Sequence, residues 1–251
     1  MELASAIASD ISGICGDVFS IQIVPPGWIH FELTHSTLAT WLQSLAVGSL
    51  AGLGTGDWGL GTGDWGLGTG DWGLGTGDWG LGTGGDEGTR GQGGLLKPMP
   101  NAQFAVQYAH ARCCSLVLLA HQEGLIKLRE PVPNTSPAFW DVISPNPLPW
   151  LNCDGTLRLN HLDERRLIGE LIQVIDNIEC PDVSGCVKWE KVALNLSQAF
   201  EKFWSNCRIW GEVKITSPEL AQARLGLLMA TQSVLRYVLE ENLGVFALLE
   251  L

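Results

Sequence analysis

Tyr108 and Arg112 lie four residues apart in the run Gln-Tyr-Ala-His-Ala-Arg at 107–112, within a stretch whose apolar spacing predicts a helix. Residues four apart share one helix face, so the ring and the guanidinium would be presented together. A ring can stack on an unpaired base, and a guanidinium can bind a phosphate or a base edge. Gln103, Gln107 and His110 form a polar strip beside them. The spacing leaves open a second interpretation, in which Tyr108 is partly buried and His110 bonds to the backbone.

Few other residues are of types and spacings that suggest catalysis. The run Asp-Glu-Arg-Arg at 163–166 is typical of the charged first turn of a helix rather than of an acid–base pair. His30 and His35 have no Cys or Asp partner at a motif spacing, and no Ser–His–Asp signature is present. The seven cysteines match no zinc pattern and are interpreted as buried thiols. The sequence therefore predicts no catalytic residue, no metal and no cofactor.

The heptad Gly-Thr-Gly-Asp-Trp-Gly-Leu recurs four times without substitution across residues 54–81. Its tryptophans could form a stacking ladder for bases or sugars. A tandem GGGACTG repeat in the DNA would translate to this heptad, because a seven-base unit returns to frame after three copies. The unit is also too short and too rich in glycine to bury a face of its own. We interpret residues 48–100 as a Gly-rich, low-complexity linker.

Charge is distributed unevenly along the chain. Residues 1–94 contain ten Asp and Glu against one Lys or Arg, and residues 95–251 contain 17 against 14, which gives −9 and −3. This balance argues against DNA and against general nucleic-acid binding by bulk charge, although a local basic face remains possible. The N-terminus lacks the pattern of a signal peptide, and no apolar run is long enough to span a membrane. We therefore expect a cytoplasmic protein without a membrane partner.

Two segments have the patterning of folded structure. Residues 1–47 predict a helix, strands over 19–24 and 28–33, and a second helix capped by Thr34 or Ser36. After residue 100 the pattern predicts a helical bundle. Its helices are expected over 102–122, from Asn160, from about Ser184 and from Ser217.

Several sequence blocks follow one another through the bundle: 107–112, Leu194, 199–200, 203–204, 207–208, 223–225, 234–235 and 243–245. In order and spacing they resemble the DALR anticodon-binding domain of arginyl-tRNA synthetases across residues 101–246. The resemblance implies a mainly α fold, tRNA as a partner with arginine tRNA as the family's substrate, and RNA-binding roles for six residues. Those residues are Gln107, Tyr108, His110, Arg112, Arg208 and Arg224.

The N-terminal segment is similar to the other end of the same enzymes. The run Pro-Gly-Trp-Ile-His-Phe-Glu-Leu at 26–33, followed by Trp41 and Leu42, resembles the small α+β domain of the family. The Rossmann core and signature loops that the family places between the two parts are missing. The C-terminal residues 246–251 and the proline-rich stretch 130–157 also depart from the family's pattern. The expected organisation is an N-terminal fragment (1–47), a linker (48–100) and a DALR-like domain (101–251).

Together these features predict a tRNA-binding accessory or remnant of arginyl-tRNA synthetase that does not aminoacylate on its own. The alternative is a protein-interaction module that kept the helical fold and lost RNA binding. Salt dependence of binding would distinguish the two, because phosphate contacts weaken steeply as ionic strength rises.

Overall fold

The computed structural model describes residues 2–48, 101–129, 134–137, 139–180 and 187–251. The predicted repeat linker therefore lies outside the described residues, apart from its first position. The expected helix start near Ser184 and part of the proline-rich stretch also lie outside them.

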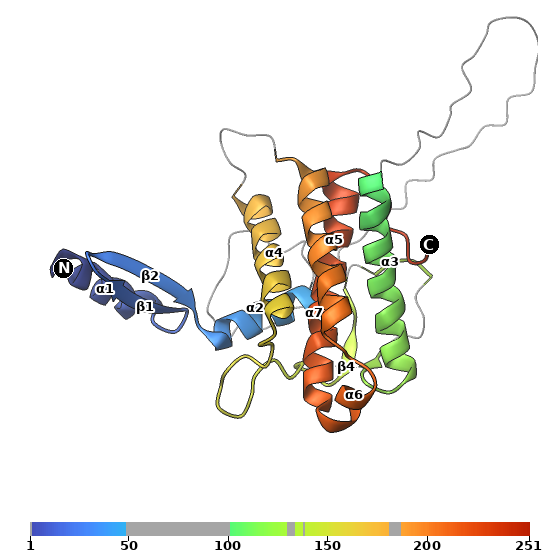
Figure 1. The fold of residues 1–251 in the computed structure, drawn as a ribbon, viewed down its shortest axis with the longest axis horizontal. Coiled ribbons are helices and arrows are strands. Elements are labelled where there is room, and N and C mark those ends of the chain that lie inside the picture. The colour runs from blue at the N-terminus through green and yellow to red at the C-terminus, as the bar shows by residue number, and fades with distance from the viewer. Residues whose placement is uncertain (1, 49–100, 130–133, 138, 181–186) are drawn as a thin grey trace, which may run out of the picture. The chain divides into compact units, whose positions relative to one another are not determined.

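The N-terminal elements follow the predicted order (Figure 1). They are α1 (Glu2–Cys15), β1 (Phe19–Val24), β2 (Trp28–Leu33) and α2 (His35–Val47). The strands pair antiparallel with Phe19 opposite Leu33, and side chains of β1 alternate between half-buried and exposed. Thr34 caps α2, since its hydroxyl accepts a hydrogen bond from the backbone N–H of Thr37 at 3.3 Å.

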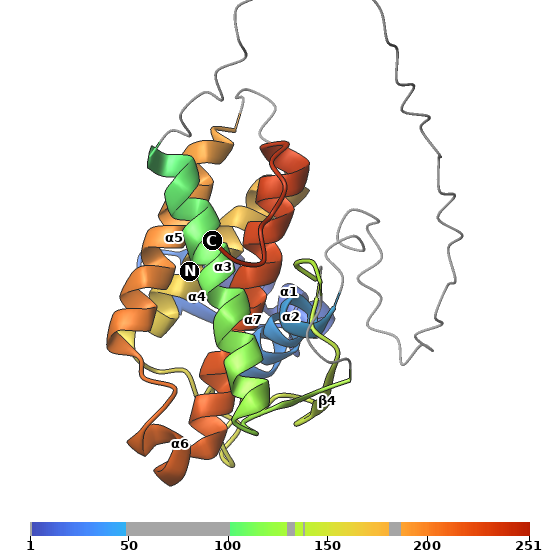
Figure 2. The ribbon, with the colours of Figure 1, turned by 90° about the vertical axis from the view of Figure 1, so that its right-hand side faces the viewer.

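Four long helices form the bundle, which confirms the predicted mainly α fold (Figure 2). They are α3 (Asn101–Gln122), α4 (Leu162–Glu179), α5 (Trp189–Asn206) and α7 (Pro218–Tyr237). The smaller elements are α6 (Glu212–Thr216), a π-helical turn (Val238–Asn242) and the paired short strands β3 (Lys127–Leu128) and β4 (Val142–Ser144).

Helix α7 is the central element of the core. Its side chains from Leu225 to Leu235 are all buried, and α2, α3, α4 and α5 pack against it. Gly226 allows one close approach: a Cβ there would lie 2.6 Å from Cη2 of Trp150 and 2.8 Å from Cδ1 of Leu148. Any larger residue at 226 would therefore force the indole to move.

Helix α2 belongs to the same core as the bundle. Leu42, Leu45 and Ala46 are fully buried in the cluster that the bundle helices share. Oε1 of Gln43 accepts hydrogen bonds from the indole Nε1 of Trp150 at 2.7 Å and from the backbone N–H of Leu148 at 3.0 Å. Packing thus joins the end of the N-terminal segment to residues more than 100 positions later.

The start of α4 differs from the expected one by a single residue. The cap is His161 rather than Asn160: its Nδ1 accepts from the backbone N–H of Asp163 at 3.2 Å. Glu164 completes a capping box, because its Oε2 accepts from the backbone N–H of His161 at 2.7 Å. The prediction that residues 163–166 form a charged first turn is confirmed.

Candidate nucleic-acid interface

Tyr108 and Arg112 lie on the exposed side of α3, as their spacing predicts. Tyr108 keeps 47% of its surface accessible, and Arg112 is also exposed. The guanidinium of Arg112 lies over the ring of Trp204 on α5, with 5.3 Å from Cζ to the ring centroid. This distance is that of a cation–π interaction, which leaves the edge of the guanidinium free for hydrogen bonds.

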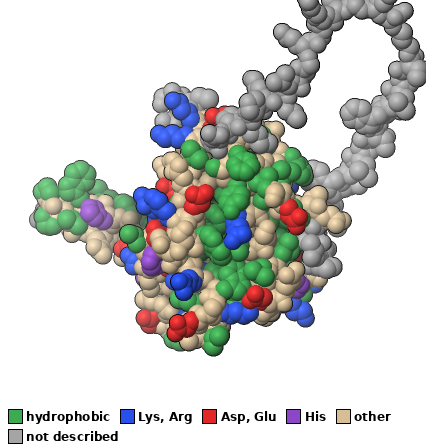
Figure 3. Space-filling view, turned by 45° about the vertical axis from the view of Figure 1, so that its right-hand side comes forward, with side chains coloured by type: hydrophobic (Ala, Val, Ile, Leu, Met, Phe, Trp, Pro, Cys, Tyr) green, Lys and Arg blue, Asp and Glu red, His purple; other side chains and the backbone are tan. Residues whose placement is uncertain are grey.

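Further aromatic side chains extend this surface on both helices. Phe104 lies one turn before Tyr108 on α3 and is 55% exposed. Trp204 packs edge to face with Trp210, with ring centroids 5.8 Å apart and planes at 74°, and both rings are half-buried. We call Phe104, Tyr108, Arg112, Trp204 and Trp210 the aromatic–arginine face. Figure 3 shows hydrophobic side chains gathered in a patch on the body of the molecule.

Gln107 and His110 are buried and do not lie on this surface. Gln107 is 1% exposed; its Nε2 donates to the carbonyl of Phe246 at 2.7 Å and its Oε1 accepts from the N–H of Leu248 at 3.2 Å. Nδ1 of His110 lies 2.9 Å from the carbonyl of Leu248. The second interpretation of His110, a bond to the backbone, therefore describes its position. Both residues hold the C-terminal segment against α3.

The other side of the His110 ring closes a buried polar cluster. Its Nε2 lies 2.9 Å from Oγ of Ser136 and 3.1 Å from Nε2 of Gln232. Since both neighbours can donate, a ring protonated at Nδ1 and unprotonated at Nε2 satisfies every contact. Burial lowers the pKa of His110 from 6.5 to about 4, so the ring is neutral at physiological pH.

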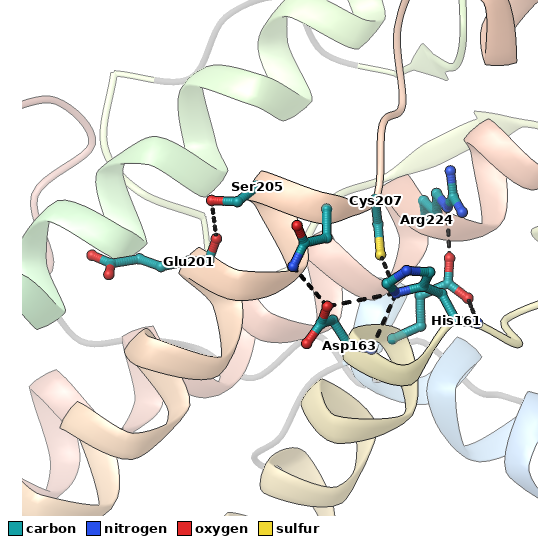
Figure 4. A network of polar contacts seen from close by, with 8 residues as sticks. His161, Asp163, Glu201, Ser205, Cys207 and Arg224 are labelled. Atoms are coloured by element: carbon teal, nitrogen blue, oxygen red, sulfur yellow. Dashed lines mark hydrogen bonds and ion pairs between the residues drawn. The ribbon is translucent and has the colours of Figure 1, made fainter.

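Arg224 is occupied inside the protein. Its Nε donates to Oε1 of Glu164 at 2.6 Å, and Glu164 is only 1% exposed (Figure 4). A second guanidinium nitrogen, Nη1, donates to the backbone carbonyl of Arg208 at 2.6 Å. Because the same carboxylate also caps α4, Arg224 ties α4, α7 and the loop after α5 together. Arg208, the second residue after the end of α5, has an exposed side chain.

Cys207, His161 and Asp163 approach one another beside this ion pair, but they do not form a catalytic triad (Figure 4). Sγ of Cys207 lies 3.3 Å from Nδ1 of His161, and the carboxylate of Asp163 lies 3.6 Å from the same nitrogen. A relay needs the base and the orienting acid on opposite ring nitrogens. Burial, followed by the nearby charge of Glu164, raises the pKa of the Cys207 thiol to about 12, so it is not a nucleophile at neutral pH.

Sequence reasoning did not find the partners that arrange these groups. Trp204 is predicted only as part of the family-like block 203–204, and its pairing with Arg112 spans two helices. Glu164 was assigned to a helix start, and its contact with Arg224 bridges 60 positions.

Comparison with known proteins agrees with the predicted resemblance. Residues 152–250 match the family described as the DALR anticodon binding domain. The chain is 32% identical over 148 residues to an arginine–tRNA ligase of Synechococcus sp. (strain JA-3-3Ab), covering 59% of this chain and 22% of that protein. An arginine–tRNA ligase of Salinibacter ruber (strain DSM 13855 / M31) is 30% identical over 137 residues, or 54% of this chain and 20% of its own length. The chloroplastic/mitochondrial arginine–tRNA ligase of Arabidopsis thaliana is 28% identical over 144 residues, which cover 57% of this chain and 18% of that protein.

The chain thus spans about a fifth of the length of the curated relatives it matches. The matched family range begins after α3, which carries Tyr108 and Arg112. No solved structure matches the chain significantly. Among the helices that the structure describes, none is long and apolar enough to cross a membrane.

Proposed function

We propose that this chain, whose residues 152–250 match the DALR anticodon binding domain, binds tRNA in the cytoplasm through the aromatic–arginine face. The observation that carries the proposal is the placement of Arg112 over Trp204, next to the exposed ring of Tyr108. Stacking on an aromatic ring and a fixed guanidinium are the two elements that proteins use to hold an unpaired base beside its phosphate.

The roles of the six predicted residues then divide into two groups. Tyr108 would stack on an unpaired anticodon base, and Arg112 and Arg208 would meet phosphate or a base edge. Gln107, His110 and Arg224 would act indirectly, because their polar atoms are engaged within the protein. Gln107 and His110 hold the C-terminal segment against α3, and Arg224 holds the start of α4.

The chain is not proposed to charge tRNA by itself. The arginine–tRNA ligases that it resembles are several times longer, and no Rossmann core is apparent in the sequence. Purified chain should therefore show no arginine-dependent exchange of pyrophosphate into ATP, and measurable exchange would refute this part of the proposal.

A protein-interaction module is the second candidate. Residues 95–251 carry a net charge of −3, and the aromatic–arginine face offers one exposed arginine among four aromatic rings. Aromatic residues and arginine are also the types enriched at protein interfaces. For this second candidate we expect binding of a protein partner with an affinity that changes little with salt concentration.

A gel-shift titration with total tRNA at two salt concentrations tests the proposal. Tyr108→Ala and Arg112→Ala should each weaken binding several-fold, and the arginine change should reduce the slope against log salt by about one. Arg166→Ala is the matched control, because Arg166 is an exposed arginine on α4. Equal affinity of all three variants and the parent, or no salt-dependent binding at all, would favour the second candidate.

A further inference from the structure

Helix α1 presents an apolar stripe to solvent. Leu3, Ile7 and Ile14 are 75%, 41% and 83% exposed, and their spacing places them along one side of the helix. Between Leu3 and Cys15 the buried residues of α1 are Ala4 and Ala8, which lie on a neighbouring side. The helix therefore buries its alanines and leaves Leu3, Ile7 and Ile14 uncovered, while Ile11 is half-buried.

The hairpin also exposes two aromatic side chains, one on each of its faces. Trp28 and Phe31 on β2 are 67% and 50% exposed, although Phe31 packs edge to face with Phe19 at 6.0 Å. Figure 3 shows hydrophobic side chains gathered on this N-terminal part. Along α1 the exposed apolar side chains recur on one side of the helix, and apolar surface grouped in this way marks an interaction site more often than scattered single residues do.

The charge around the stripe limits what can cover it. Residues 1–48 contain four Asp and Glu and no Lys or Arg. Asp10, three residues after Ile7 and four before Ile14, falls on the border of the stripe. A surface without cations does not attract nucleic acid or an anionic membrane, since both need Lys and Arg. A second copy of the same face would bring like charges together.

We propose that the α1 stripe (Leu3, Ile7 and Ile14) docks an amphipathic helix of a partner protein whose apolar residues are flanked by Lys and Arg. The partner's apolar side chains cover the stripe, and its cations meet Asp10 at the border of the stripe. Helix-against-helix recognition of this kind is read from residues spaced three, four and seven apart. This inference does not rest on the proposed tRNA binding, which involves α3 and α5.

Fluorescence anisotropy with a labelled 18-residue helical Leu/Lys peptide as probe tests the docking surface on the full chain. Ile14→Asp should weaken binding at least tenfold. Ile215→Asp is the matched control, because Ile215 on α6 is 82% exposed and the substitution adds the same charge. Bulk attraction of a cationic peptide would rise equally in both variants, so a loss confined to Ile14→Asp identifies the stripe.

Two further measurements complete the test. Asp10→Lys should weaken binding more than Glu241→Lys, an exposed control with the same change of charge. A Leu/Glu peptide of the same pattern should bind at least tenfold more weakly than the Leu/Lys peptide. The proposal is overturned if the Ile14 and Ile215 variants bind alike, if the two charge reversals act equally, or if both peptides bind with equal affinity. Far-UV spectra matching the parent confirm that each variant is folded.

Discussion

Arg112 and Trp204 form a cation–π pair that links α3 to α5 at the protein surface, with 5.3 Å between the guanidinium carbon and the ring centroid. The pair fixes a cation next to an exposed tyrosine without using a carboxylate to hold it. An arginine held in this way keeps its charge available to an anion, whereas an arginine in an ion pair is already neutralised. Arg224 is the contrasting example in the same bundle, since Glu164 occupies its guanidinium.

The pairing predicts that Trp204→Leu weakens tRNA binding although Trp204 is itself half-buried. Loss of the ring face frees Arg112 to sample other rotamers, so part of the effect should come through the arginine. A double-mutant cycle with Arg112→Ala, read by gel shift, should give a coupling of about 0.5–1 kcal/mol. Strictly additive losses would show that the two side chains act independently.

The buried ion pair predicts a large loss of stability for Arg224→Ala. The change leaves the carboxylate of Glu164 buried without its partner, which costs about 3–5 kcal/mol. The measurement is urea denaturation followed by circular dichroism. Adding Glu164→Gln to that variant should recover part of the loss, because a neutral amide can still cap α4. Arg208→Ala is the control, since only its backbone carbonyl takes part in the contact.

The His110 cluster predicts lower stability in mild acid. The folded protein holds the pKa of His110 at about 4, while the unfolded chain takes up the proton near 6.5. Neutral His110 therefore contributes stability that is fully present above pH 6.5 and is lost as the pH falls from 6.5 through 4. The loss is about 3–4 kcal/mol when each pKa unit is counted at about 1.4 kcal/mol.

His110→Gln removes this titration and tests its origin. The variant should be less stable at pH 7, because a hydrogen bond to the C-terminal segment or to Ser136 is lost. Its free energy of unfolding should nevertheless change less between pH 6.5 and 4 than that of the parent. Parallel pH profiles for the two proteins would mean that other groups cause the acid sensitivity.

The contact of Gly226 with Trp150 predicts a cost for the smallest possible enlargement. Gly226→Ala usually favours a helix, but here the added Cβ would overlap the indole, so we expect a net loss of about 1–3 kcal/mol. The melting temperature is the readout. Gly169→Ala on α4 is the control, because a Cβ there meets nothing within 4 Å, and it should leave stability unchanged or raise it.

The helices and strands could be predicted from the sequence. So could the exposed surface of α3, but not its buried one. Helical spacing identified Tyr108 and Arg112 as neighbours on one face because that relation is local. It could not place Gln107 and His110, because their partners at 246 and 248 return from the far end of the chain. The residue types Gln and His are the same whether the side chain faces solvent or binds a buried backbone group, so residue type alone does not distinguish the two positions. The capping residue of α4 was predicted one position too early. Asn is a preferred N-cap residue and His is not, so the sequence favoured Asn160 over His161.

The burial of α2 among the bundle helices predicts that the core can assemble from two separate pieces of polypeptide. Leu42, Leu45 and Ala46 bind α7 through side chains, and Gln43 adds directional hydrogen bonds to the segment that carries Trp150. Two separately expressed pieces, residues 1–48 and 101–251, should therefore associate into one complex. Covalent connection would only raise the effective concentration of one piece around the other. Association of the two pieces would therefore measure the strength of the contact between α2 and α7.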